Sequence, residues 1–351
     1  GSLLLNMDYF DFATGLTMCC NDKWESLFGV PRRPRESLLD QRHMDLALAI
    51  QQATEDIVLA MAATAKKLTG ADNLVMAGGV ALNCVANGKL IRRGIFQDLW
   101  IQPAAGDAGG ALGAALAARH IWQGAERQLP NPQRDSMQGA YLGPEYGADD
   151  ILRVARRRRA PFRRYDDFDE LTREVARLLT QGQVVGWFQG RMEWGPRALG
   201  NRSILGDSRH PEMQKRLNLK IKYRVQENHR HPLPEGYETQ ELFERLYHLR
   251  SDVPAITHVD YSARIQTVHR DTNQKYWRLI AAFKELTGCG LIVNTSFNVR
   301  GEPIVCTPED AYQCFMRTEM DYLVMGDFLF SKTDQPAWQE TGDWRTEFEL
   351  D

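Results

Sequence analysis

The sequence lacks several features that define common protein classes. It has six cysteines in 351 residues and no C-x-x-C pair, so reduced thiols are expected, as in a cytoplasmic protein. No apolar run reaches the roughly 18 residues that a membrane span requires. The start, Gly1-Ser2-Leu3, has no basic leader that would mark a signal peptide. The net charge of −3 gives no reason to expect nucleic acid or an anionic membrane as the main partner.

The first third of the chain shows the alternation of strands, glycine turns and helices that is typical of an α/β layer. Gly70 is expected to end a long amphipathic helix, and residues 3–10 read as a strand. The expected helices are 43–69, 82–93 and 111–122, and the expected strands are 73–77 and 98–101.

A second α/β unit is expected from about residue 140, after a polar, proline-rich linker at 123–137. Pro308 opens a helix in it, since proline fits the first turn. The polar tail after Lys332 is expected to be frayed. The unit's other expected helices are 148–158 and 167–181, and its expected strands are 184–188, 291–294 and 321–325.

Two glycine-rich turns follow strands of the first unit. Gly78 and Gly79, followed by Asn83, could bring backbone N–H groups close to a nucleotide, or could simply form a tight turn. Asp107 lies in the second turn, Gly106–Gly110, where a carboxylate serves either as a helix N-cap or as a ligand for a metal ion. The residues alone leave both alternatives open.

The second unit concentrates cations in the loop that follows the strand at 184–188. This loop carries Arg191, Arg197 and Arg202 among three glycines, and the planar guanidinium group binds phosphate in bidentate fashion. The alternative is a surface loop with solvated arginines. Further along, Lys220, Lys222 and Arg224 alternate on one face of an extended segment, where they repel one another unless an anion binds there or solvent screens them.

A polar segment follows the strand at 291–294. It presents amides and hydroxyls at the end of a strand, which is where ligands bind in α/β sheets. Its residues are Asn294, Thr295, Ser296 and Asn298, with Arg300 nearby. We therefore predict that the cations of 197–224 and the polar segment 294–300 converge around one anionic ligand.

The two glycine turns resemble the C-terminal half of the actin/hexokinase/Hsp70-type (ASKHA) fold, in particular its TsaD-like branch. The resemblance implies nucleotide contacts for Gly78, Gly79 and Asn83, and a metal-ligand role for Asp107. The histidines that would complete that metal site belong to an H-x-x-x-H motif, which this sequence does not contain. His229 and His231 are too close together to match it.

Lys222-x-Arg224 and Ser296-x-Asn298 resemble the paired signature of YrdC-like domains, which bind ATP and form a carbamoyl adenylate. Longer strings resemble the antibiotic and nodulation-factor O-carbamoyltransferases of the NodU/CmcH/TobZ family: GRMEWGPRALGNRSIL, NLKIKYR, PAITHVDYSARIQTV and NTSFNVRGEPIVCTPEDA. The catalytic residues that this resemblance implies are Lys222, Arg224, Ser296, Asn298 and Arg197. The remaining implied contacts to nucleotide or carbamoyl phosphate are Arg202, Ser203, Lys220, His258, Arg264, Asn294, Thr295 and Arg300.

The resemblance implies half of an actin/hexokinase/Hsp70-like domain followed by a YrdC-like α/β domain. The expected boundaries are 1–125 for the TsaD-like part, 126–139 for the linker, 140–332 for the YrdC-like domain and 333–351 for the tail. The N-terminal half with the histidine ligands is expected to be absent. A stretch that the family carries after its K-Y-R also has no counterpart, because Arg224 is followed directly by Val225.

The expected activity is the transfer of a carbamoyl group from carbamoyl phosphate, activated with ATP, to a hydroxyl of a small natural product or sugar. Mg²⁺ is expected with ATP, and Fe²⁺ is the metal that the resemblance suggests for Asp107. No nucleic acid or membrane partner is expected, a homodimer is one candidate assembly, and a cytoplasmic location is expected. The alternatives are an enzyme of the tRNA threonylcarbamoyladenosine type and a nucleotide-binding module without catalysis.

Overall fold

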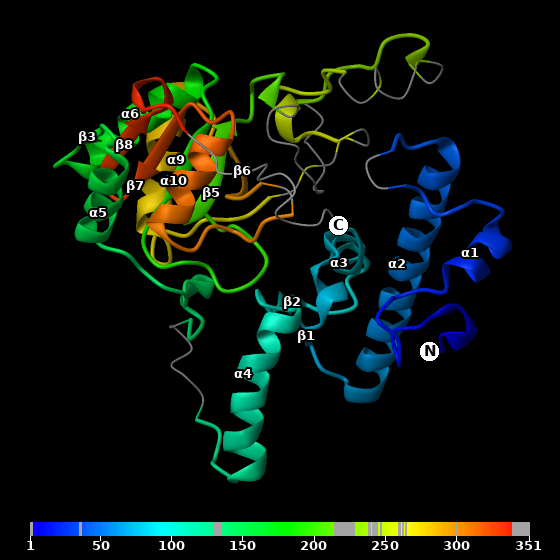
Figure 1. Ribbon diagram of the computed structural model, residues 1–351. Helices are drawn as coiled ribbons and strands as arrows, with labels where there is room; N and C mark the ends of the chain where they lie inside the picture. The colour runs from blue at the N-terminus through cyan, green and yellow to red at the C-terminus, as the bar shows by residue number, and fades with distance from the viewer. Residues whose placement is uncertain are drawn as a thin grey trace. The chain divides into compact units, whose positions relative to one another are not determined.

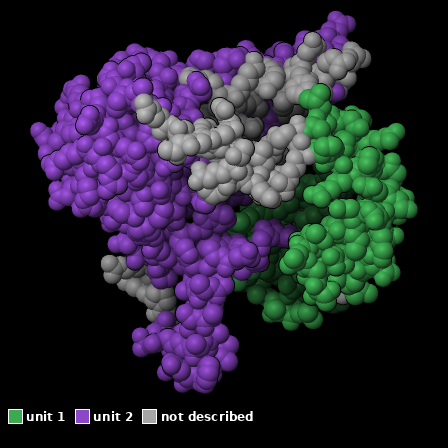
Figure 2. Space-filling model, viewed as in Figure 1, with its two compact units in different colours: residues 1–76, 81–101, 349–351 green, residues 77–80, 102–348 purple. Residues whose placement is uncertain are grey.

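The structure is a computed structural model of the whole chain. It describes every residue except the following: 1–2, 35–36, 129–134, 214–228, 238–239, 241–244, 246–247, 259–260, 262, 264, 300 and 339–351. The described part divides into two compact units, coloured separately in Figure 2. Unit 1 contains residues 3–76 and 81–101, and unit 2 contains residues 77–80 and 102–338.

Unit 1 is built on the long helix α2, Gln41–Thr69, which confirms the helix predicted at 43–69. The Asp40 side chain accepts a hydrogen bond from the His43 amide at its start, and Gly70 ends it in the left-handed conformation. The shorter helix α1, Asn21–Phe28, precedes it. The strand predicted at 3–10 is wrong: Met7–Tyr9 form a short 3-10 helix, η1, because Asn6 caps the turn with its side chain.

The strands β1, Asn73–Met76, and β2, Asp98–Ile101, pair in parallel in unit 1. The short 3-10 helix η2, Gly79–Leu82, and helix α3, Cys84–Arg93, connect them. Helix α3 is held to α2 by polar contacts: Gln51 exchanges hydrogen bonds with Asn83 (2.9 and 3.2 Å), and Lys89 pairs with the buried Glu55. By length and composition alone α2 could cross a membrane, with a mean hydropathy of 1.3 in its most apolar window. These polar side chains in its middle bind another helix, so that finding is weak evidence for a span.

The first helix of unit 2 after residue 102 is α4, Asp107–Ala117, which continues into a π-helical turn, η3, at Ala118–Trp122. Its main body is a mixed sheet of six strands in the order β3-β8-β7-β4-β5-β6. Strand β4 is parallel to β7 and antiparallel to β5, and β5 is antiparallel to β6. The strands are β3 Arg163–Arg164, β4 Val185–Phe188, β5 Arg202–Asp207, β6 Ile292–Ser296, β7 Tyr322–Met325 and β8 Phe328–Ser331.

Helices cover both faces of this sheet (Figure 1). Alternate residues of β4 and β5 point to opposite faces, so Phe188 and Ile204 join one hydrophobic cluster and Trp187 and Leu205 join the other. The first cluster includes α5, Ala148–Arg158, and α10, Pro308–Arg317; the second includes α6, Phe168–Thr180, and α9, Gln274–Thr287. The resulting three-layer arrangement confirms the predicted α/β class.

Candidate functional site

Two segments that are almost one hundred residues apart in sequence meet at one edge of the six-stranded sheet. Strand β4 ends and β5 begins there, with Phe188 opposite Arg202, and Ser203 of β5 lies opposite Ser296 of β6. We call residues 189–202 the arginine loop and residues 294–299 the polar turn. The side-chain amide of Asn294 donates to the Ala198 carbonyl (3.2 Å), and the backbone N–H of Phe297 donates to the Arg202 carbonyl (3.2 Å). The described parts of the two predicted segments therefore do converge.

A single buried carboxylate organises the arginine loop. One oxygen of Glu193, Oε1, accepts hydrogen bonds from the backbone N–H groups of Leu199 (2.8 Å), Asn201 (2.7 Å) and Arg202 (3.2 Å). The Glu193 side chain is 5% exposed, and its other oxygen, Oε2, has no hydrogen-bond partner among the described residues. Three backbone N–H groups of the loop thus already bind an anion within the protein, the carboxylate of Glu193.

A network of neutral side chains fixes the same loop from outside. The side-chain NH₂ of Asn201 donates to the Arg191 carbonyl (2.7 Å), and the side-chain oxygen of Asn201 accepts from the side-chain NH₂ of Asn273 (2.8 Å). Asn273 also donates to the Tyr141 hydroxyl (3.0 Å), which in turn donates to the Leu199 carbonyl (2.8 Å). Burial raises the pKa of Tyr141 to about 12; the Asn273 hydrogen bond opposes this shift and the Glu193 charge adds to it. The phenol therefore remains a donor at neutral pH.

Two glycines allow the loop to pack as closely as it does. Gly200 has a φ of 105°, and a Cβ atom there would lie 2.2 Å from the Tyr276 ring. Gly195 has a φ of 128° and lies against the backbone of Pro103 and Ala104, within unit 2. Ala104 is fully buried. The contact therefore holds the segment 103–104, which leads into the second glycine turn at Gly106, against the arginine loop.

Arg202, where the loop runs into β5, is fully buried. Its guanidinium group stacks on the Phe188 ring (3.7 Å to the ring centre) and donates to backbone carbonyls, most closely that of Gln189 (2.7 Å). Burial lowers the pKa of Arg202 to about 10, an effect that the nearby Glu193 charge opposes, so the group is still a cation at neutral pH. Its predicted contact with a bound phosphate stays a prediction, since both terminal nitrogens already contact the protein.

The remaining predicted residues of this edge differ in how accessible they are. Arg197 is half-buried, and its Nε has no hydrogen-bond partner in the part of the chain that the structure describes. Ser203 is fully buried and its hydroxyl accepts from the Gly200 N–H (3.2 Å). Thr295 and Ser296 are half-buried, and the Asn298 side chain donates to the carbonyls of Val299 (2.9 Å) and Glu302 (2.7 Å). Arg197, Thr295 and Ser296 are thus partly accessible, with Thr295 and Ser296 pointing to opposite faces of the sheet.

Five predicted residues lie outside the described residues: Lys220, Lys222, Arg224, Arg264 and Arg300. His258 is described and half-buried, and its carbonyl accepts from the Tyr261 N–H (3.0 Å). The roles predicted for these six residues stay predictions.

Two of the residues predicted in the first glycine turn, Gly78 and Asn83, have structural partners. The exposed Gly78 donates its N–H to the Ala105 carbonyl (2.7 Å) in unit 2, and Gly79 is also exposed. Asn83, in unit 1, caps α3 by accepting from the amides of Val85 (3.2 Å) and Ala86 (3.1 Å). This capping leaves the nucleotide contact predicted for Asn83 as a prediction.

Asp107 is exposed in the first turn of α4, where Gly106 is the N-cap. Its carboxylate makes no hydrogen bond or ion pair with any other described residue. The described residues contain no group of three or more histidine, cysteine, aspartate or glutamate side chains that could hold a metal ion. One carboxylate does not make a metal site, so the described residues do not complete the site that the resemblance implies, and the metal-ligand role of Asp107 stays a prediction.

Sequence reasoning missed the residues that shape the site. Glu193 lies within the segment GRMEWGPRALGNRSIL, but no function was predicted for it. Tyr141 and Asn273 are 132 residues apart in sequence. The one local signal was Asn273 itself, because asparagine before a helix is a common N-cap, and it does cap α9 through the Tyr276 N–H (3.0 Å).

Comparisons with known proteins give one consistent answer. The family model described as "Carbamoyltransferase N-terminus" matches residues 1–116, and the one described as "Carbamoyltransferase C-terminus" matches residues 176–332. An uncharacterized protein from Synechocystis is 51% identical over all of this chain and 62% of its own length. The nodulation protein NolO from Bradyrhizobium diazoefficiens is 40% identical over 87% of this chain and 57% of its own length.

The 3'-hydroxymethylcephem-O-carbamoyltransferase of Streptomyces clavuligerus is 30% identical over 88% of this chain and 59% of its own length. The chain thus spans about three fifths of the length of these relatives. The alignment with the Synechocystis protein extends over 386 positions, so that relative contains residues with no counterpart among the 351 of this chain. Both family models point the same way, and together they match most of the sequence: the chain belongs to the carbamoyltransferase family.

Proposed function

We propose that this chain is part of an O-carbamoyltransferase that uses ATP and carbamoyl phosphate. The observation that carries the proposal is the convergence of the arginine loop and the polar turn at one edge of the sheet. The arginine loop carries Arg197 and the buried cation of Arg202, and the polar turn carries the half-buried Thr295 and Ser296. Such a site suits a polyanion flanked by polar groups, which is the chemistry of ATP and carbamoyl phosphate.

In the proposed reaction, carbamoyl phosphate is hydrolysed to carbamate and phosphate, and a carbamate oxygen attacks the α-phosphorus of ATP. Pyrophosphate leaves and carbamoyl adenylate remains. An acceptor hydroxyl then attacks the carbonyl carbon, AMP leaves, and the hydroxyl proton passes to a base. Activation is needed because the carbamoyl nitrogen donates into the carbonyl and weakens it as an electrophile.

Forming the adenylate brings anions together, so it requires clustered positive charge in a partly dry site. We assign that work to Arg197, Lys222, Arg224 and Arg300. Arg202 contributes its buried charge. Ser296 orients the nucleotide, and Asn298 holds the backbone of the polar turn. Loss of one direct contact is expected to cost about 2–4 kcal/mol of transition-state stabilisation.

We further propose that unit 2 contains a YrdC-like domain and that the chain's first part is half of an actin/hexokinase/Hsp70-like domain. The small-molecule acceptor, a sugar or a natural product, would be carbamoylated in that first part. The names of the nodulation and cephem relatives favour an acceptor of this kind. Mg²⁺ with ATP, a homodimer and a cytoplasmic location belong to the same proposal.

The test is carbamoyl-phosphate-dependent exchange of labelled pyrophosphate into ATP. Exchange that requires carbamoyl phosphate supports adenylate formation. Hydrolysis of ATP without any such dependence would instead favour a nucleotide-binding module. If exchange required threonine with bicarbonate rather than carbamoyl phosphate, an enzyme of the threonylcarbamoyladenosine type would be the better assignment.

A further inference from the structure

The buried carboxylate of Glu193 lies in a loop that we expect to bind anions. A negative charge there works against anion binding by simple electrostatics. Yet Glu193 is 5% exposed, and its Oε1 accepts from three backbone amides of the same loop. Hydrogen bonds to a charged acceptor are worth about twice as much as neutral ones. This carboxylate is therefore a strong constraint on the backbone between residues 193 and 202.

We propose that Glu193 is the positioning residue of the anion site. By bonding the amides of Leu199, Asn201 and Arg202, it fixes the chain segment that carries Arg197 and the start of β5, where Ser203 lies opposite Ser296. It acts through these neighbours and touches no reacting atom. The inference rests on the proposed function for the identity of the anion, but not for the geometry.

Positioning and simple electrostatics predict opposite effects on ATP binding when the charge of Glu193 is removed. If Glu193 were only a nearby charge, replacing it with a neutral residue would strengthen ATP binding. If it positions the loop, Glu193→Gln weakens ATP binding, because a neutral amide oxygen holds the three N–H groups less firmly. The substituted Nε2 would also put two donors where the buried Oε2 now has no hydrogen-bond partner among the described residues.

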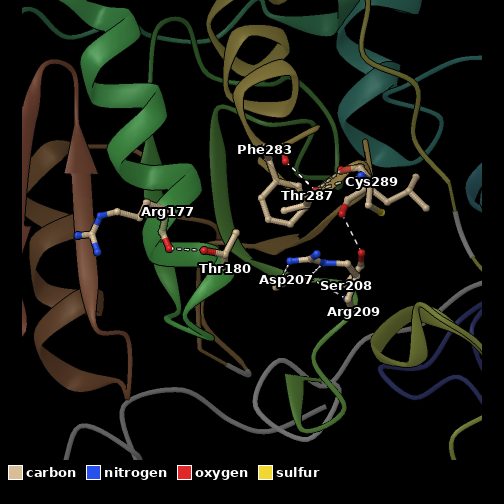
Figure 3. Close-up of polar contacts among 9 residues, drawn as sticks. Arg177, Thr180, Asp207, Ser208, Arg209, Phe283, Thr287 and Cys289 are labelled. Atoms are coloured by element: carbon tan, nitrogen blue, oxygen red, sulfur yellow. Dashed lines mark hydrogen bonds and ion pairs between the residues drawn. The ribbon is translucent and has the colours of Figure 1, made fainter. Parts of the chain in front are cut away.

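The chain offers a matched control at the other end of the same strand (Figure 3). Asp207 is 4% exposed and its carboxylate also accepts three hydrogen bonds, all from Arg209: from its N–H (2.8 Å), its Nε (3.0 Å) and a terminal nitrogen (2.7 Å). Arg202 and Asp207 are the first and last residues of β5, so about 17 Å of strand separates them. Asp207→Asn should lower stability without affecting the anion site.

The experiment measures ATP binding by isothermal titration calorimetry, and the melting temperature, for wild type, Glu193→Gln and Asp207→Asn. We expect both variants to melt earlier, and only Glu193→Gln to bind ATP about tenfold more weakly, a change of about 1.4 kcal/mol. In the exchange assay, Glu193→Gln should raise KM for ATP more than it lowers kcat. Glu193→Asp keeps the charge but shortens the reach, so it should not restore binding.

Equal effects of Glu193→Gln and Asp207→Asn on ATP binding would overturn the proposal, as would tighter or unchanged binding by Glu193→Gln. If Glu193→Gln does not fold, Glu193→Asp takes its place: it keeps the charge, but its shorter side chain cannot hold the same three N–H groups. Normal ATP affinity in that variant would also count against positioning. Wild-type protein that binds ATP but shows no carbamoyl-phosphate-dependent exchange would refute the proposed function and leave this inference standing.

Discussion

Replacing Gly200 with alanine tests how tightly the arginine loop is packed. The residue has a φ of 105°, and the new Cβ would lie 2.2 Å from Cδ1 of Tyr276. The backbone strain is expected to cost about 1–3 kcal/mol, and the overlap with a buried ring a further 1–3 kcal/mol or so. Tyr276 has little room to move, because it is 3% exposed and its N–H is held by Asn273.

The assay compares melting temperatures of Gly200→Ala and Gly288→Ala. Gly288 also has a positive φ, 73°, but a Cβ there would meet no atom within 4 Å. With a total of about 4 kcal/mol for Gly200→Ala, we expect its melting temperature to fall by roughly 10 °C, and that of Gly288→Ala by about 3 °C for a cost near 1 kcal/mol. Similar shifts in the two variants would show that Tyr276 does not confine the loop, and the packing argument would fail.

Three further expectations follow from single side chains. Asn83→Ala should lower the free energy of unfolding by about 1–2 kcal/mol, because α3 loses its cap, and Asn83→Ser should retain most of that stability. Urea unfolding measures both variants, and an equal loss of stability in the two would exclude capping as the cause. Cys314 is 2% exposed, and burial raises the pKa of its thiol to about 12, so it should resist alkylation at pH 8 in the folded protein while half-buried cysteines react, as read by mass spectrometry; rapid labelling of Cys314 would contradict its burial. Asp107→Ala should leave pyrophosphate exchange intact and abolish transfer to the acceptor, and loss of exchange as well would show that the two steps are not divided between the two parts of the chain.

The helices that the sequence predicted best are those with a clear apolar stripe and a marked end. Helix α5 begins and ends at the predicted residues, 148 and 158, and α2 ends at the predicted Gly70. Strand β5 was missed because its start, Arg202-Ser203, reads as the continuation of a polar loop. All six of its residues are buried, polar ones included, so it shows no alternation of apolar and polar positions.

The meeting of the two segments at one sheet edge was predictable, because polar residues after buried strands gather where ligands bind. The roles of Glu193 and Arg202 were not. A glutamate and an arginine in a loop usually face water. Only the folded structure shows that Glu193 accepts hydrogen bonds from three backbone N–H groups and that Arg202 stacks on the Phe188 ring. Tyr141 and Asn273 come from distant parts of the sequence, and no local pattern could pair them.

The most direct test of the account is a crystal structure of the protein with carbamoyl phosphate and a non-hydrolysable ATP analogue. We predict that one bound ligand accepts hydrogen bonds from both the Arg197 guanidinium and the Ser296 hydroxyl. A ligand that contacts the arginine loop or the polar turn alone, or that binds away from both, would contradict the claim that these segments form a shared anion site.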